Sequence, residues 1–199
     1  WFHQHYPKTP IVLLVRNPAD VFASWRYLGW IQKKTQTHFA MARLLFDRRF
    51  HTAFPQAQSF WARQDFHPEG FPMFLYDWYA SAVMPLKQLP SGSYLLVGYE
   101  EFRRDLGATA ATVCRYLDIP DRAPAFEALS GRSSSTDYGN RSRGAAGGNL
   151  PLVDELRDSG ELSKADAMLR ALSPLTMDDL IADPAAALRA HPPEAYRLG

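Results

Sequence analysis

The chain has 199 residues, of which 46% are hydrophobic, 22% charged and 13% aromatic. This composition excludes a disordered tail and a collagen-like repeat, and with Cys114 as its single cysteine the chain cannot be a disulfide scaffold. The length suits one compact domain. The formal net charge of +1 argues against bulk attraction to nucleic acid or membranes, and no apolar run approaches the roughly 20 residues of a membrane span.

The first regular element predicted in chain order is a strand followed by a helix. Residues 11–15 (IVLLV) form an apolar run that is typical of a strand buried on both faces, as in a parallel sheet covered by helices. Asn17 can cap a helix whose first position is Pro18, with Asp20 near its positive end, and we expect this helix to stop near Gly29.

Residues 30–72 are the hardest stretch to interpret. We expect a helical segment over 40–50 followed by a loop, and this stretch either shapes a substrate surface or is a surface excursion without a role. From Met73, apolar residues recur at helical spacing, and Pro85 should kink or end that helix.

The next predicted strand covers 94–97, and a further helix ends before Pro120. Strands that alternate with helices predict an α/β fold with a parallel sheet. Residues 131–149 hold five glycines, four serines and three arginines, which is typical of a flexible linker, although the arginines also suit an anion-binding loop.

Charge divides the chain into two parts. Residues 1–149 contain 17 Lys/Arg against 12 Asp/Glu, whereas residues 150–199 contain 5 against 9. We therefore expect an anion site within the α/β domain 1–149, and a helical C-terminal extension 150–199 packed on the same domain. The extension should form short helices over 152–157, 163–172 and 176–181, with Ser163 and Asp166 as a capping pair.

Arg16 is the strongest candidate for anion binding. It follows a strand of the parallel type, at the end where open α/β sheets bind ligands, and the next helix would present backbone N–H groups to the same place. Ser24 lies about two helical turns further on. A phosphate site is one interpretation, and a structural salt bridge of Arg16 is the other.

The segment Val15-Arg16-Asn17-Pro18-Ala19-Asp20-Val21-Phe22-Ala23-Ser24 resembles the 3′-phosphate-binding motif of sulfotransferases. These enzymes use 3′-phosphoadenosine 5′-phosphosulfate as the sulfuryl donor. The resemblance implies that Arg16 and Ser24 hold the 3′-phosphate of this donor.

Two later segments resemble the family in the same order along the chain. The run 95–102 (LLVGYEEF) is similar to a strand whose following tyrosine, here Tyr99, approaches the nucleotide. The run 143–147 (RGAAG) resembles a loop that closes over the 3′-phosphate through a basic residue and Gly144. The family often has two adjacent basic residues there, and because Ser142 interrupts the pair, either Arg141 or Arg143 could reach the phosphate.

The resemblance implies a P-loop-type α/β fold and sulfuryl transfer to a hydroxyl or amine of a small-molecule, carbohydrate or peptide acceptor, without a metal and without nucleic acid as a partner. The family's phosphosulfate loop is not found, since Pro10 replaces the glycine that would follow Lys8 and Thr9. We therefore expect the chain to be truncated at its N-terminus and inactive by itself. Compartment and oligomeric state are not predicted.

No catalytic base is assigned. His3 and His5 match no motif, His38, His51 and His67 fall in the possible acceptor region, and no histidine stands at metal-ligand spacing. Two alternatives stay open: a small-molecule or nucleotide kinase of P-loop type, which needs a GxxxxGK[ST] loop, and a noncatalytic α/β binding module.

Overall fold

The computed structural model describes residues 5–6, 8–27, 48–53, 55–63, 70–120 and 150–198. Its two described strands, β1 (Ile11–Val15) and β2 (Tyr94–Gly98), pair in parallel from Ile11↔Tyr94 to Val15↔Gly98. The helices in the first part of the chain are α2 (Pro18–Tyr27), α4 (Arg48–Ala53), α5 (Pro55–Ala62), α6 (Phe71–Gln88), α7 (Tyr99–Arg104) and α8 (Leu106–Tyr116). The C-terminal helices are α11 (Leu150–Asp158), α12 (Glu161–Leu172), α13 (Met177–Ala182), α14 (Pro184–Arg189) and the 3₁₀ turn η1 (Pro193–Ala195).

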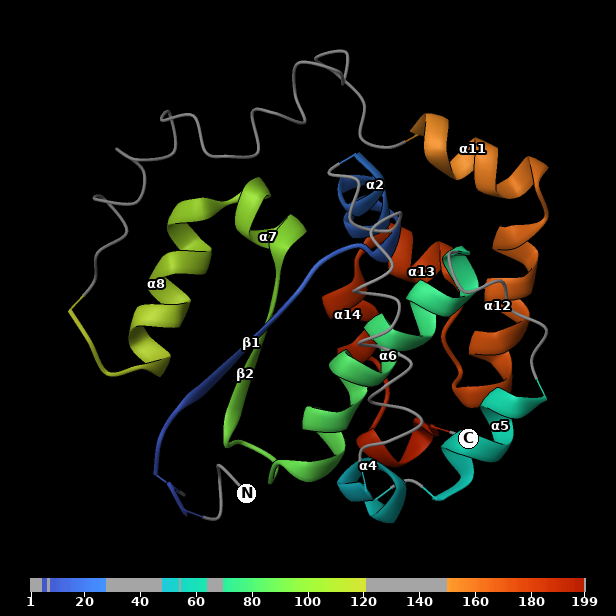
Figure 1. The fold of residues 1–199 in the computed structure, drawn as a ribbon. Helices are drawn as coiled ribbons and strands as arrows, with labels where there is room; N and C mark the ends of the chain where they lie inside the picture. Colours follow the sequence, from blue (N-terminus) through green and yellow to red (C-terminus); the bar gives the residue numbers. More distant parts are fainter. Residues whose placement is uncertain are drawn as a thin grey trace.

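The prediction of a parallel sheet flanked by helices is confirmed, although the sheet has two strands among the described residues. Helix α8 lies on one side of the strand pair, and α6 with the C-terminal helices lies on the other (Figure 1). Because the strands are parallel, their carboxyl ends meet at one end of the sheet, where α2 and α7 begin.

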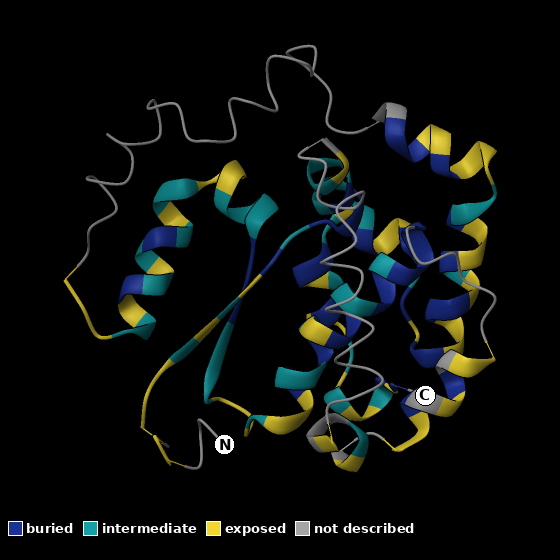
Figure 2. Ribbon diagram, viewed as in Figure 1, coloured by how far each residue is buried: buried dark blue, intermediate teal, exposed yellow. Residues whose placement is uncertain are grey.

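The burial of β1 differs from the prediction. Val12 is 36% exposed and Leu14 62% exposed, so only alternate residues of the run face covered space (Figure 2). The apolar run Ile11–Val15 is therefore not buried on both faces, and this prediction is wrong. Successive side chains of a strand point to opposite faces, and in the described structure one of these faces is left open.

The turn from β1 into α2 forms as predicted. The side-chain oxygen of Asn17 accepts the backbone N–H of Ala19 at 2.9 Å and, more weakly, that of Asp20 at 3.4 Å. Pro18 is the first residue of α2, where its missing N–H costs no hydrogen bond. The predicted stop at Gly29 lies outside the described residues.

Pro85 does not end its helix, which was one of the two outcomes predicted for it, and the loop predicted after residue 50 is wrong. Helix α6 continues through Pro85 to Gln88, because the proline lies in the last turn and the Leu89 N–H still donates to the Pro85 carbonyl at 2.9 Å. The loop expected after residue 50 is instead helical where it is described, in α4 and α5.

The three predicted C-terminal helices agree with α11, α12 and α13 to within two residues at every end, and the structure adds α14. Helix α14 is not among the predicted helices, and it begins at Pro184, which occupies the first helical position after the Asp183 cap, where proline is tolerated. Ser163 and Asp166 do not form a capping pair: α12 begins two residues earlier, after Gly160 in the left-handed conformation (φ 76°), and the Asp166 side chain instead accepts the Met177 N–H at 3.0 Å.

Helix α6 joins the two parts of the chain in one apolar core. Its buried tyrosines point their hydroxyls at the C-terminal backbone, where Tyr76 donates to the Leu198 carbonyl at 2.7 Å and Tyr79 to the Arg197 carbonyl at 2.9 Å. Burial raises the pKa of both hydroxyls, so they stay protonated donors. Buried residues from both parts form one cluster, to which α12 contributes Leu162, Ala165, Met168, Leu169 and Leu172.

Candidate functional site

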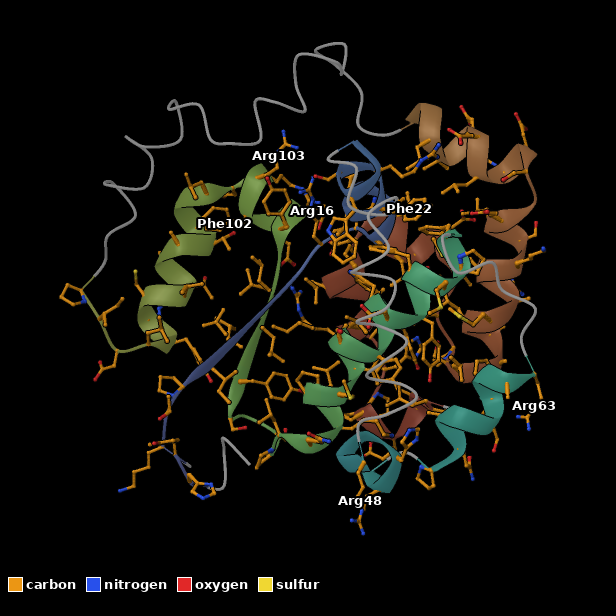
Figure 3. All side chains as sticks on the ribbon, in the orientation of Figure 1. Arg16, Phe22, Arg48, Arg63, Phe102 and Arg103 are labelled. Carbon is orange, nitrogen blue, oxygen red and sulfur yellow. The ribbon has the colours of Figure 1, made fainter. Side chains whose placement is uncertain are left out.

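The strand register brings two predicted site residues together. Val15 is paired with Gly98. Arg16 and Tyr99 directly follow these two strand ends and therefore lie at the same end of the sheet. The Arg16 guanidinium carbon lies over the Tyr99 ring, 4.5 Å from its centroid. Figure 3 shows Arg16 at this end of the strands, between α2 and α7. The two residues therefore act as one unit, with the tyrosine supporting the cation.

The guanidinium of Arg16 is held in place but keeps unused hydrogen-bonding capacity. The side chain is 20% exposed, and its contact with Asp20 is long, at 3.9 Å. Its buried Nε–H has no hydrogen-bond acceptor among the described residues. An unsatisfied donor on a mostly buried cation is costly unless a ligand accepts from it. The arrangement suits a bidentate contact with an oxyanion.

The first turn of α2 contributes less to anion binding than we predicted. Its N–H groups at Ala19 and Asp20 already donate to the Asn17 side chain, and Pro18 has no N–H. The expectation that these groups face a phosphate is therefore wrong, because the cap that starts the helix occupies them. Among the described residues at this end of β1, the Arg16 Nε–H has no acceptor, in contrast to these backbone N–H groups.

Sequence reasoning gave no role to the two glutamates after Tyr99. Glu100 Oε1 accepts the backbone N–H of Asn17 at 2.8 Å and so links α7 to the β1–α2 turn, while its Oε2 is buried without a hydrogen-bond partner among the described residues. Glu101 Oε2 accepts the backbone N–H of Gly98 at 3.0 Å. The signal was present as two carboxylates in the first turn of a helix, where they can accept free N–H groups.

Glu101 is also ion-paired. Its burial alone would raise its pKa, but hydrogen bonds from Arg189 and the Gly98 N–H, together with the positive charges of Arg189 and Arg104, outweigh burial and hold the pKa below its ordinary value. The carboxylate is therefore firmly ionised near neutral pH, and it anchors the residue that precedes Tyr99.

The other predicted site residues are not brought into this cluster by any described contact. Ser24 is half-buried in the second turn of α2. Arg141, Arg143 and Gly144 lie outside the described residues, as do His3, His38 and His67. Of the remaining histidines, His5 is exposed and His51 is half-buried in α4.

A groove of about 330 Å³ runs along β1 and ends at Arg16. Its floor is the strand itself, from Val12 onward, and α6 supplies a wall through Trp78, Ala82 and Pro85. The Trp78 indole N–H donates to the Arg16 carbonyl at 3.0 Å, so this wall also fixes the backbone that carries the guanidinium. The groove offers apolar space directly beside a cation.

The described part of the chain lacks two other kinds of feature. It contains no group of three His, Cys, Asp or Glu side chains placed to hold a metal ion. None of its helices has the length and apolarity that a bilayer span requires.

Comparison with known protein families identifies the α/β part. The family model described as the sulfotransferase domain matches residues 4–137, which is more than half of the chain. The chain belongs to the sulfotransferase family. The match includes Arg16, Ser24 and Tyr99, and it ends before Arg141 and before the C-terminal helices. No curated protein and no solved structure matches the chain.

Proposed function

We propose that this sulfotransferase-family chain binds the 3′-phosphate of 3′-phosphoadenosine 5′-phosphosulfate and serves sulfuryl transfer to a hydroxyl or amine acceptor. In this reaction the acceptor attacks sulfur, the bond from sulfur to the 5′-phosphate oxygen breaks, adenosine 3′,5′-bisphosphate leaves and the acceptor loses a proton. The base that takes the proton is not assigned. The P-loop-type architecture that the family implies is part of the same proposal.

The observation that carries the proposal is the state of Arg16. It lies at the carboxyl end of a parallel strand, is 20% exposed, and has a buried Nε–H without an acceptor among the described residues. A purely structural salt bridge would use these donors within the protein, whereas the described contact with Asp20 is 3.9 Å long. Remote anchoring of this kind can align a reactive group elsewhere on the same ligand.

The remaining assignments extend this anchor. Tyr99 would support the guanidinium from below, since a contact with the ring face does not use the Nε–H of Arg16, which has no acceptor among the described residues. Ser24 would add an uncharged donor, and Arg143 or Arg141, with the Gly144 backbone, would close over the phosphate. The family match favours sulfuryl transfer over the kinase alternative.

The test is calorimetric titration of the 199-residue chain with adenosine 3′,5′-bisphosphate and with adenosine 5′-monophosphate, which lacks the 3′-phosphate. We expect the bisphosphate to bind more tightly, and Arg16→Ala to remove at least about tenfold of its affinity, because hydrogen bonds to charged groups contribute about 1.5–3 kcal/mol. Binding of the monophosphate should change little.

A charge-matched control is Arg115→Ala. Arg115 precedes Tyr116, whose hydroxyl lies 3.4 Å from the Ile11 nitrogen at the opposite end of β1 from Arg16. This variant should bind both nucleotides as the parent chain does. Equal affinity of the parent chain and Arg16→Ala for the bisphosphate would show that the phosphate assignment is wrong and would favour a noncatalytic binding module.

A further inference from the structure

The C-terminal helices reach both turns that carry the candidate site. On the β1–α2 side, the Asn17 side-chain amide donates to the Ile181 carbonyl of α13 at 3.0 Å. Asn17 directly follows Arg16, and its other side-chain atom caps α2. One buried side chain therefore connects α13, the start of α2 and the residue after the candidate phosphate ligand.

The β2–α7 side is held by α14. Arg189 Nη2 lies 2.6 Å from both carboxylate oxygens of Glu101, and Glu101 in turn accepts the Gly98 N–H at 3.0 Å. The next residue is Tyr99, the support for Arg16. Helix α14 also packs directly on this turn, since a Cβ placed on Gly98 would lie 3.0 Å from the Ala185 Cβ.

These contacts cross long sequence separations. Residues 17 and 181 are 164 positions apart, and residues 101 and 189 are 88 positions apart. Both C-terminal partners lie beyond the part of the chain that the sulfotransferase family model matches. The matched part thus contains Arg16, Ser24 and Tyr99, while some of the groups that hold the turns of Arg16 and Tyr99 come from outside it.

We propose that α13 and α14 are a positioning element for the candidate 3′-phosphate site, with Arg189 as the positioning residue that acts on Tyr99 through Glu101 and Gly98. The proposal rests on the proposed function for the identity of the ligand. Arg189 touches no ligand in this scheme. It restricts the β2–α7 turn, so that the Tyr99 ring stays under the Arg16 guanidinium.

We expect the ion pair between Arg189 and Glu101 to affect the β2–α7 turn more than the overall free energy of unfolding. The Arg189 side chain is 44% exposed, and exposed ion pairs contribute little to the overall free energy of folding. Its removal should therefore loosen one turn and leave the core intact. This difference separates a positioning role from a merely structural one.

The experiment compares Arg189→Met with Arg170→Met and Arg189→Lys. Arg170 is the matched control because it also pairs with a carboxylate, Asp166 at 2.7 Å, but within α12 and one helical turn away. The readouts are the affinity for adenosine 3′,5′-bisphosphate, hydrogen exchange of individual backbone amides, and the thermal midpoint of unfolding.

We expect Arg189→Met to weaken bisphosphate binding on the order of tenfold and to accelerate exchange of the Gly98 amide by a similar factor. Amides of the α6 and α12 core should exchange as in the parent chain, and the thermal midpoint should match that of Arg170→Met. Arg189→Lys should recover part of both effects, because a lysine can still pair with the carboxylate.

Bisphosphate affinity and amide hydrogen exchange together distinguish a failure of this proposal from a failure of the proposed function. If the parent chain does not bind the bisphosphate, the proposed function fails, and the exchange data alone decide whether α14 holds the turn. Unchanged Gly98 exchange in Arg189→Met, or faster exchange throughout the core, overturns the positioning role. Tight binding by Arg189→Met despite a loosened turn also overturns it.

Discussion

The α/β part and the C-terminal helices use their apolar residues differently. In β1, Leu14 is 62% exposed and Val12 36% exposed, whereas in α12 to α14 the leucines are almost completely buried. The candidate ligands, in contrast, all lie in 1–149. The comparison indicates that the candidate ligands and an exposed strand face lie in the first part, whereas the acidic C-terminal part supplies buried leucines to a core that it shares with α6.

Shared contacts explain why the two parts form one core. Helix α12 packs along α6, whose tyrosine hydroxyls donate to C-terminal carbonyls. The Lys87 ammonium group donates to the Tyr196 carbonyl at 2.6 Å, so the same helix also binds the end of the described chain. Helix α6 therefore contacts the Arg16 backbone through Trp78 and the C-terminal turn through Lys87.

The sharpest test of this division compares the same substitution in each part. Leu169→Ala removes a side chain that is fully buried in α12 and should cost about 2–5 kcal/mol in the free energy of unfolding. Leu14→Ala should cost less than about 0.5 kcal/mol, because that side chain is mostly exposed already. Urea unfolding followed by circular dichroism measures both, and equal costs would contradict the division.

A second substitution probes the contact surface between the two parts. Gly98→Ala places a Cβ 3.0 Å from the Ala185 Cβ and 3.2 Å from Glu101 Cγ. Neither the helix nor the strand can move without disturbing its neighbours, so we expect a loss of about 1–2 kcal/mol in the free energy of unfolding.

The control for this substitution is Gly107→Ala in α8. Gly107 lies in the first turn of α8, where the preference for alanine over glycine is smaller than the value of about 1 kcal/mol in a helix interior, so this variant should unfold at the same or a slightly higher urea concentration. A Gly98→Ala variant that is as stable as the parent chain would show that α14 does not press on the strand end.

The smallest expected effect concerns pH. The pKa of Glu101 is held below its ordinary value of 4.5 in the folded chain, so the stabilisation from its charged form is fully present above pH 4.5 and is lost as pH falls through the lowered pKa. The difference in unfolding free energy between the parent chain and Glu101→Gln should therefore shrink in acid, from a value of under about 1 kcal/mol near neutral pH.

Urea midpoints of the two chains, measured from pH 7 down to pH 3, check this expectation. Glu194→Gln is a suitable control, since Glu194 is an exposed acid of the C-terminal part. A difference between the parent chain and Glu101→Gln that stays constant with pH would contradict the assigned pKa direction.

Local sequence signals account for much of the fold. Three elements were predictable because caps and apolar periodicity act within a few residues. These are the start of α2 at Asn17-Pro18, the strand over 94–97 and the helix that begins at Leu106. The same local rules failed at Pro85 and Pro184. Pro85 lies in the last turn of α6 and does not end that helix, and Pro184 begins α14, a helix that the local pattern does not predict.

The candidate site was predictable only in its separate pieces. Arg16 and Tyr99 were identified from motifs, but their contact depends on the parallel register that pairs Val15 with Gly98. The roles of Glu100 and Glu101 were not recognised, because their partners, the Asn17 N–H and the Arg189 side chain, lie far away in the sequence.

The sequence by itself therefore determined where strands and helices begin and which cation stands at a strand end, since those features depend on neighbouring residues. Only the tertiary structure decided that Glu100 of α7 accepts the Asn17 N–H, that one face of β1 is open in the described structure, and that α13 and α14 contact the turns of the candidate site. The physical reason is that pairing, packing and hydrogen bonding between distant segments depend on where the whole chain places them, and no local pattern encodes that placement.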